Sequence, residues 1–137
     1  MRWGLIGASD IAETRVIPAL LANQQEIVVV QSTKIERASE FATRNNISKS
    51  TDNLEQLLNS DIDAVYISST NEKHFEQAMA AIKAKKHLLC EKPIAMTLTH
   101  AQEMVTAAEN AKITFATNHH IRVAGSHQLV QIGRAHV

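Results

Sequence analysis

The chain has 137 residues, of which 45% are hydrophobic and 20% charged, values typical of one globular domain with its own core rather than of a disordered segment. Fourteen basic and fourteen acidic side chains cancel, which argues against a nucleic-acid-binding surface and against a polybasic membrane anchor. No apolar run reaches the length of a membrane span, no signal peptide is recognisable, and the one cysteine, Cys90, excludes an internal disulfide, so we expect a cytoplasmic protein.

The run from Arg2 to Ala12 predicts a strand, a tight turn and the start of a helix. The short apolar beginning is typical of a buried strand in a parallel sheet. Gly7 stands where the chain must turn sharply. Ser9 and Asp10 can cap the helix that follows, whose apolar spacing extends over 11–23.

This turn favours a bound anion, typically a phosphate, because a helix N-terminus presents free backbone N–H groups. The dinucleotide-binding spacing G-x-G-x-x-G/A is partly met, since Gly7 and Ala12 hold the first and third places and Ser9 replaces the middle glycine. The Ser9 hydroxyl can donate to phosphate, whereas the carboxylate of Asp10 repels a diphosphate unless it points away. The alternative is an ordinary turn between a strand and a helix.

The rest of the chain alternates between short strand-like runs and helical patterns. Further strands are predicted over 27–31, 63–67, 87–90 and 113–117, and helices over 34–44, 53–59, 71–84 and 97–110. Cys90 is expected to be a buried residue of its strand. Repeated strand–helix units imply an α/β fold with a doubly wound parallel sheet and helices on both faces.

Ligands of such sheets bind beyond the carboxyl ends of the strands. Each later strand is followed there by polar residues, which are Ser32-Thr33, Ser68-Ser69-Thr70-Asn71, Glu91-Lys92-Pro93 and Asn118-His119-His120. We therefore expect these four groups to face one edge of the sheet.

The residues after the second strand indicate which nicotinamide cofactor is bound. NAD enzymes usually place an acid there for the ribose 2′-hydroxyl, but Ser32, Thr33, Lys34 and Arg37 follow here. Cations in the first turn of a helix oppose its dipole, and a bound 2′-phosphate would relieve this repulsion. The pattern predicts a preference for NADPH. The alternative is that Lys34 and Arg37 are solvated beside Glu36.

Two further groups are candidates for cofactor contact. Ser69, Thr70 and Asn71 stand where hydroxyls and an amide could line a cofactor, and His74 is one turn further along. The alternative is that Asn71 only caps a helix and that His74 lies on the surface.

Lys92 is the candidate for chemistry, because it follows a buried strand directly. Hydride delivery to a ketone builds negative charge on oxygen, and a cation that donates a proton stabilises it. Glu91 can steady Lys92 or the cofactor, and Pro93 stiffens the turn and can carry a cis bond. The alternative is one more exposed lysine.

Adjacent histidines point in different directions, so His119 and His120 do not easily serve one site, and no metal is expected.

Together these motifs resemble the Gfo/Idh/MocA family of oxidoreductases. The resemblance rests on residues 4–12 (GLIGASDIA), 68–74 (SSTNEKH), 90–95 (CEKPIA) and 118–120 (NHH), and its most specific element is Glu91-Lys92-Pro93. It implies a Rossmann domain, the cofactor NADP(H) and the reduction of a sugar-like ketone.

The resemblance also implies roles by position. Ser9, Asp10 and Ile11 would lie at the pyrophosphate, Ser32, Thr33 and Arg37 at the 2′-phosphate, and Ser69, Thr70, Asn71, His74, Glu91 and Asn118 along the rest of the cofactor. Lys92 matches the catalytic lysine of the family. Asp10 departs from the small neutral residue that relatives often carry.

Family members continue into a second α/β domain that covers the nicotinamide and contacts the substrate, and we expect this chain to end before it. The last residues, 132–137 (IGRAHV), match the translation of a common sequencing adapter, so we expect a Rossmann domain over 1–131 and a non-native tail after it. The alternative is a natural Ile-Gly-Arg.

The other functions that the sequence allows are a non-catalytic NADP-binding regulator and a cyclitol or sugar-alcohol dehydrogenase. Formation of an oligomer is left open.

Overall fold

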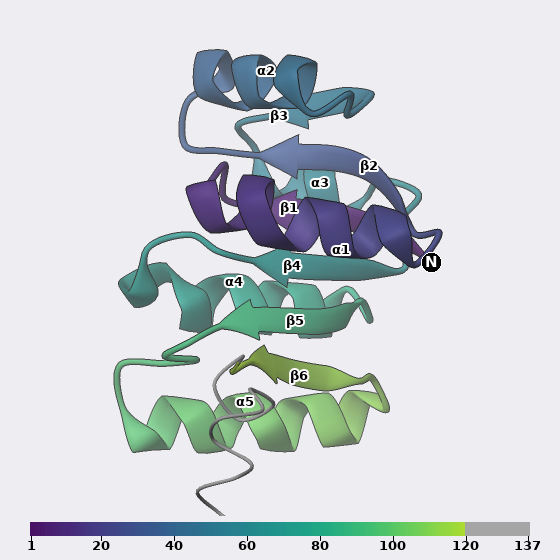
Figure 1. Ribbon diagram of the computed structural model, residues 1–137. Coiled ribbons are helices and arrows are strands. Elements are labelled where there is room, and N and C mark those ends of the chain that lie inside the picture. The colour runs from purple at the N-terminus through teal and green to yellow at the C-terminus, as the bar shows by residue number, and fades with distance from the viewer. Residues whose placement is uncertain (120–137) are drawn as a thin grey trace, which may run out of the picture.

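A six-stranded parallel sheet organises residues 1–119, which are the residues that the computed structural model describes (Figure 1). The strands are β1 (Arg2–Ile6), β2 (Glu26–Gln31), β3 (Lys49–Thr51), β4 (Ala64–Ile67), β5 (His87–Glu91) and β6 (Phe115–Asn118). They lie in the order β3-β2-β1-β4-β5-β6, so the direction of winding reverses between β1 and β4. The predicted doubly wound parallel sheet is confirmed.

Helices cover both faces of this sheet. They are η1 (Ala12–Val16), α1 (Ile17–Ala22), α2 (Ile35–Arg44), α3 (Leu54–Leu58), η2 (Asn71–Lys73), α4 (His74–Lys83) and α5 (Leu98–Ala111). In Figure 1, α1 crosses in front of β1, whereas α3 and α4 lie behind the sheet. No helix within residues 1–119 is long and apolar enough to cross a membrane.

Two apolar cores result, because successive residues of a strand point to opposite faces. Leu5 packs in a cluster with Val16 of η1 and Phe41 of α2. Its neighbour Ile6 packs in the other cluster, which includes Met104 of α5. Leu5 and Ile6 are both fully buried.

The first helix is predicted in the right place, but its middle is irregular. Helical structure begins at Asp10, and the π-helical segment η1 precedes α1. The N–H of Ile17 bonds the carbonyl of Ala12 five residues back, and the next residue, Pro18, has no N–H to donate. A Pro inside a helix disturbs the bonding of the preceding turn, and the wider π turn accommodates it here.

The cap predicted at Ser9 is confirmed, whereas Asn71 does not cap its helix. Ser9 caps the first helix by accepting from the N–H of Ala12 at 3.2 Å, and Thr97 caps α5 by accepting from the N–H of His100 at 3.2 Å. Asn71, expected to cap its helix, instead begins the 3-10 turn η2, where no side-chain cap is made.

Two strand predictions need correction. The edge strand β3 was not predicted, because Lys49, Ser50 and Thr51 show no apolar alternation. The last strand, predicted over 113–117, is found at Phe115–Asn118. The expected domain boundary at 131, the tail 132–137 and His120 lie outside the described residues.

The turn after β1 brings two parts of the backbone unusually close together. Gly7 has a φ of +107°, and its N–H donates to the carbonyl of Gln31 at 2.9 Å. A Cβ built on Gly7 would lie 2.8 Å from the carbonyl carbon of Ser68 and from the nitrogen of Ser69. Only glycine fits this position, because both its conformation and the space beside it exclude a side chain.

Gly7→Ala is expected to lower the free energy of unfolding by at least about 2 kcal/mol, because strain at a positive φ adds to a clash with backbone atoms that cannot move aside. The measurement is urea unfolding followed by circular dichroism. Gly4→Ala is the matched control, since the Cβ there meets the flexible ends of Ile62 and Leu57 instead of backbone. An equal loss for both variants would contradict the prediction.

Candidate functional site

A cavity of about 290 Å³ opens at the carboxyl ends of β1, β2 and β4, where the winding of the sheet reverses. Such a position is where doubly wound sheets bind ligands. The predicted site residues that line the cavity are Gly7, Ser9, Ser32, Thr33, Arg37, Ser69 and Thr70. The structure therefore brings together residues from three separate loops of the sequence.

Ser9 organises the wall of this cavity at the first turn. Its hydroxyl oxygen accepts from the N–H of Ala12 and its hydroxyl donates to Oγ of Ser68 at 2.7 Å. Ser68 also contacts the carbonyl of Gly7 at 3.3 Å. The loop after β1 is thus tied to the loop after β4 by side chains as well as by the backbone approach at Gly7.

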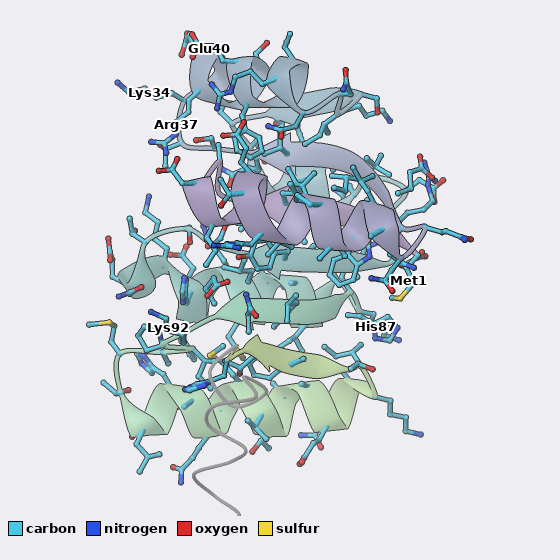
Figure 2. All side chains as sticks on the ribbon, viewed as in Figure 1. Met1, Lys34, Arg37, Glu40, His87 and Lys92 are labelled. Carbon is cyan, nitrogen blue, oxygen red and sulfur yellow. The ribbon has the colours of Figure 1, made fainter. Side chains whose placement is uncertain are left out.

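The charged side chains that line the cavity are both basic. They are Arg37 from α2 and Lys73 from η2, and Arg37 donates to the carbonyl of Ala8 at 2.8 Å. Figure 2 shows Arg37 beside the start of the first helix, whereas Lys34 extends away from the protein. Among residues 1–119, this cavity has two lining cations, a helix N-terminus and no lining acid, which favours an anionic ligand.

A second polar cluster lies at the ends of β4, β5 and β6. The phenol of Tyr66 donates to Oε1 of Glu91 at 2.6 Å, and the amide of Asn118 donates to the same oxygen at 2.5 Å. Glu91 is only 6% exposed and forms no salt bridge within residues 1–119. A buried carboxylate is thus held by two neutral donors.

This cluster has a marked effect on Tyr66. Burial, the hydrogen bond to Glu91 and the charge of that carboxylate raise the pKa of the Tyr66 phenol well above its ordinary value. Tyr66 is fully buried, so the phenol stays neutral and remains a donor to Glu91 across the ordinary pH range.

Lys92 follows this cluster directly and is exposed. The Lys92–Pro93 peptide bond is cis, as the sequence suggested it could be. In Figure 2, Lys92 lies at the same edge of the sheet as Arg37, and His87 lies at the opposite edge. The candidate catalytic side chain and the basic cavity therefore share the carboxyl edge.

The remaining predicted residues lie outside the cavity. Asp10 and Asn71 are exposed and do not line it. Ile11 borders a separate apolar groove of about 790 Å³ between the first helix and β5, together with Asn118. His74 is fully buried and contacts two backbone carbonyls, so the surface position considered for it is wrong; it does not line the cavity.

Several lining residues were not among the predicted site residues. These are Ala8, Gln31, Ser68, Lys73 and Gln77. Ala8, Gln31 and Ser68 adjoin predicted positions, but Lys73 and Gln77 belong to the helices after β4. Gln77 accepts from the hydroxyl of Ser69 at 2.5 Å, a contact that no sequence motif signals.

Cys90 and the histidines complete the site region. Burial raises the pKa of the Cys90 thiol to about 12, and its predicted place inside the strand is confirmed. His119 is exposed. Among residues 1–119, no three His, Cys, Asp or Glu side chains gather as they would around a metal ion.

Comparison with known proteins adds to this geometry. The profile of the Gfo/Idh/MocA group, described as an oxidoreductase family with an NAD-binding Rossmann fold, matches residues 1–119. A 1,5-anhydro-D-fructose reductase from Ensifer adhaerens is 53% identical over 131 residues, which cover 95% of this chain and 39% of that protein. A scyllo-inositol 2-dehydrogenase (NADP(+)) from Bacillus subtilis is 35% identical, over 86% of this chain and 39% of that protein.

Solved structures agree with these matches. A 3-ketoreductase from Actinomadura kijaniata, in complex with NADP and TDP-benzene, superposes with a TM-score of 0.90 at 29% identity. The superposition covers 98% of this chain and 42% of that one. This chain therefore spans about two fifths of the length of the proteins it matches.

Glu91→Gln is expected to lower the pKa of Tyr66, because it removes the negative charge that raises this pKa. Tyr66 is the one tyrosine of the chain, so the phenolate absorbance reports it directly during an alkaline titration. In the native chain the band should stay absent until the fold is lost, whereas in folded Glu91→Gln it should rise at lower pH.

The raised pKa of Tyr66 also makes the stability of the fold depend on pH. The folded state favours the neutral phenol, so the stabilisation that Tyr66 contributes is complete below pH of about 10, the unfolded pKa, and is lost as the pH rises further. Urea-unfolded chain is the control and should titrate near that ordinary value. Identical titrations of both folded proteins would contradict the assignment.

Proposed function

Because this chain belongs to the Gfo/Idh/MocA family of oxidoreductases, we propose that it is the NADP(H)-binding part of a reductase that acts on a sugar-like ketone. The observation that carries the proposal is the basic cavity at the point where the sheet reverses, with Lys92 at the same edge. The named proteins are a 1,5-anhydro-D-fructose reductase, a scyllo-inositol 2-dehydrogenase and a 3-ketoreductase, which supports the substrate class.

The choice of NADP(H) over NAD(H) rests on the end of β2. Ser32 and Thr33 line the cavity there without an acid, and Arg37 faces the same space. An acid at this position would accept from a ribose 2′-hydroxyl, whereas hydroxyls and a guanidinium suit a 2′-phosphate. A relative and a similar structure that carry NADP in their descriptions support this choice.

The other cofactor contacts follow the course of the carboxyl edge. Gly7, Ser9, Asp10 and Ile11 would lie along the pyrophosphate, at the turn after β1 where the first helix begins. Ser69, Thr70 and Asn71 would lie further along, toward Glu91 and Asn118. The buried Glu91 carboxylate offers an acceptor to a ribose hydroxyl near the nicotinamide.

The chemistry we propose assigns proton donation to Lys92. When bound, the reduced nicotinamide supplies a hydride to the carbonyl carbon of the ketone. Lys92 stabilises the negative charge that grows on the carbonyl oxygen and donates a proton to it, which yields the alcohol. Reduction of 1,5-anhydro-D-fructose is the first activity to assay, given the relative that is 53% identical.

Arg37→Gln is expected to weaken NADPH binding by about 10- to 100-fold, because a charged hydrogen bond to phosphate contributes about 1.5–3 kcal/mol. NADH binding should change by less than about twofold, since NADH has no 2′-phosphate for Arg37 to hold. The measurement is titration calorimetry of the 137-residue chain with each cofactor.

Lys34→Gln is the matched control, since it removes a nearby cation that does not line the cavity. It should leave both affinities within about twofold. Tighter binding of NADH than NADPH by the unaltered chain would overturn the cofactor assignment.

Lys92→Met is expected to lower ketone reduction by about 100-fold or more, the usual contribution of a positioned proton donor. The assay uses NADPH and the whole protein, because this chain spans about two fifths of the length of the proteins it matches. Lys83→Met, which alters an exposed lysine at the end of α4, is the control.

The activity assay also distinguishes the proposed reductase from the alternative functions. NADPH binding by a complete protein that neither reduces ketones nor oxidises cyclitols would indicate a regulatory module. Full activity of Lys92→Met would contradict the role of the lysine.

A further inference from the structure

The imidazole of His74 joins two loops of the proposed site. His74 begins α4 and is fully buried. Its Nδ1 lies 2.8 Å from the carbonyl oxygen of Pro93, and its Nε2 lies 3.2 Å from the carbonyl oxygen of Ser69. The ring therefore stands between the loop that carries Lys92 and the loop that lines the basic cavity.

The segment from Lys92 to Met96 depends strongly on this ring. Within residues 1–119, its one hydrogen bond is the contact between the Pro93 carbonyl and His74. Lys92 and Pro93 are exposed, and only Ile94 and Ala95 pack partly against the core. On the N-terminal side, Lys92 is fixed by the pairing of Glu91 with Asn118, whereas on the C-terminal side the ring supplies the hydrogen bond that holds the backbone.

The helix that carries His74 is itself well anchored. The ring of Phe75, the next residue, stacks on the ring of His100 in α5 with centroids 3.9 Å apart. Ala78 and Ala81 of α4 are fully buried in the core. The start of α4 is thus a firm support from which an imidazole can hold a loop.

The contacts of the ring also identify its donor. Both partners are carbonyl oxygens, which only accept, so each hydrogen bond requires a proton on the ring nitrogen. The contact to Pro93 is the shorter one, which assigns a proton to Nδ1.

We propose that His74 is a positioning residue whose Nδ1–H holds the backbone at Pro93 and thereby fixes Lys92 beside the cofactor cavity. Its burial separates it from any ligand in that cavity, so it acts through the loop and not by contact. We call the hydrogen bond from His74 to the Pro93 carbonyl the clamp. The role of Lys92 rests on the proposed function, but the existence of the clamp does not.

His74→Gln tests the clamp in the 137-residue chain without cofactor. Backbone ¹⁵N order parameters of residues 94–96 are expected to fall from about 0.85 to below about 0.6, because the loop loses its one described hydrogen bond. His87→Gln is the matched control. His87 also makes a ring contact to backbone, accepting from the N–H of Thr114 at 3.0 Å, but at the opposite edge (Figure 2).

Unchanged order parameters in folded His74→Gln would overturn the proposal. If that variant does not fold, long-range ¹H–¹⁵N spectra of the unaltered chain locate the ring protons instead. A proton on Nδ1 supports the clamp, and a ring protonated on Nε2 alone overturns it.

Activity of the complete protein provides a separate readout. His74→Gln should lower kcat by about 10-fold or more while the Kd for NADPH changes by less than about threefold. Loss of NADPH binding with a rigid 94–96 loop would make His74 a cofactor contact and overturn the proposal. If Lys92→Met stays active, the proposed role of Lys92 fails, and the order parameters still decide whether the clamp exists.

Discussion

The site depends on the absence of a side chain at Gly7. The turn after β1 passes so close to the backbone of Ser68 and Ser69 that a Cβ would overlap both residues. This approach places the start of the first helix next to the loop after β4, and the hydrogen bond between Ser9 and Ser68 secures it. The cavity exists because the two loops meet there, and its cations are added from α2 and η2.

At the ends of β4, β5 and β6, the carboxyl edge is organised around a buried carboxylate. Glu91 is a buried carboxylate, and burial of a charge is costly unless hydrogen bonds replace the lost water. Tyr66 and Asn118 supply these bonds from the strands on either side of β5, so the parallel order of β4, β5 and β6 is part of the arrangement. Within residues 1–119, the acid is kept in place without a salt bridge. It remains an acceptor beside Lys92.

Five of the six strands could be predicted from the sequence, because buried parallel strands are apolar runs and the helices between them show a helical spacing of apolar residues. It also located the turn residues, since the carboxyl ends of parallel strands must share an edge. It failed at β3, where three polar residues pair with β2 at the sheet edge and carry no apolar pattern. The π-helical turn before Pro18 was missed because helical periodicity does not register one wider turn.

Some of the site residues could be predicted from the sequence and others could not. Gly7, Ser9 and Ser32 lie in the turns after β1 and β2 and were placed at the cavity by topology alone. Lys73 and Gln77 reach it from helices, where the direction of a side chain depends on how the helix packs against the sheet. The role of His74 was hidden for a related reason, since its partners are carbonyl oxygens of two distant loops. Backbone groups leave no signature in a side-chain pattern.

Cys90 is fully buried in β5, next to Glu91. Because the thiolate is the reactive form, a thiol whose pKa is raised to about 12 is nearly inert while the strand is paired. Its alkylation therefore requires β5 to separate from the sheet. Cys90 is the one cysteine of the chain. The rate of its alkylation therefore reports how often β5, which carries Glu91 and leads to Lys92, opens locally.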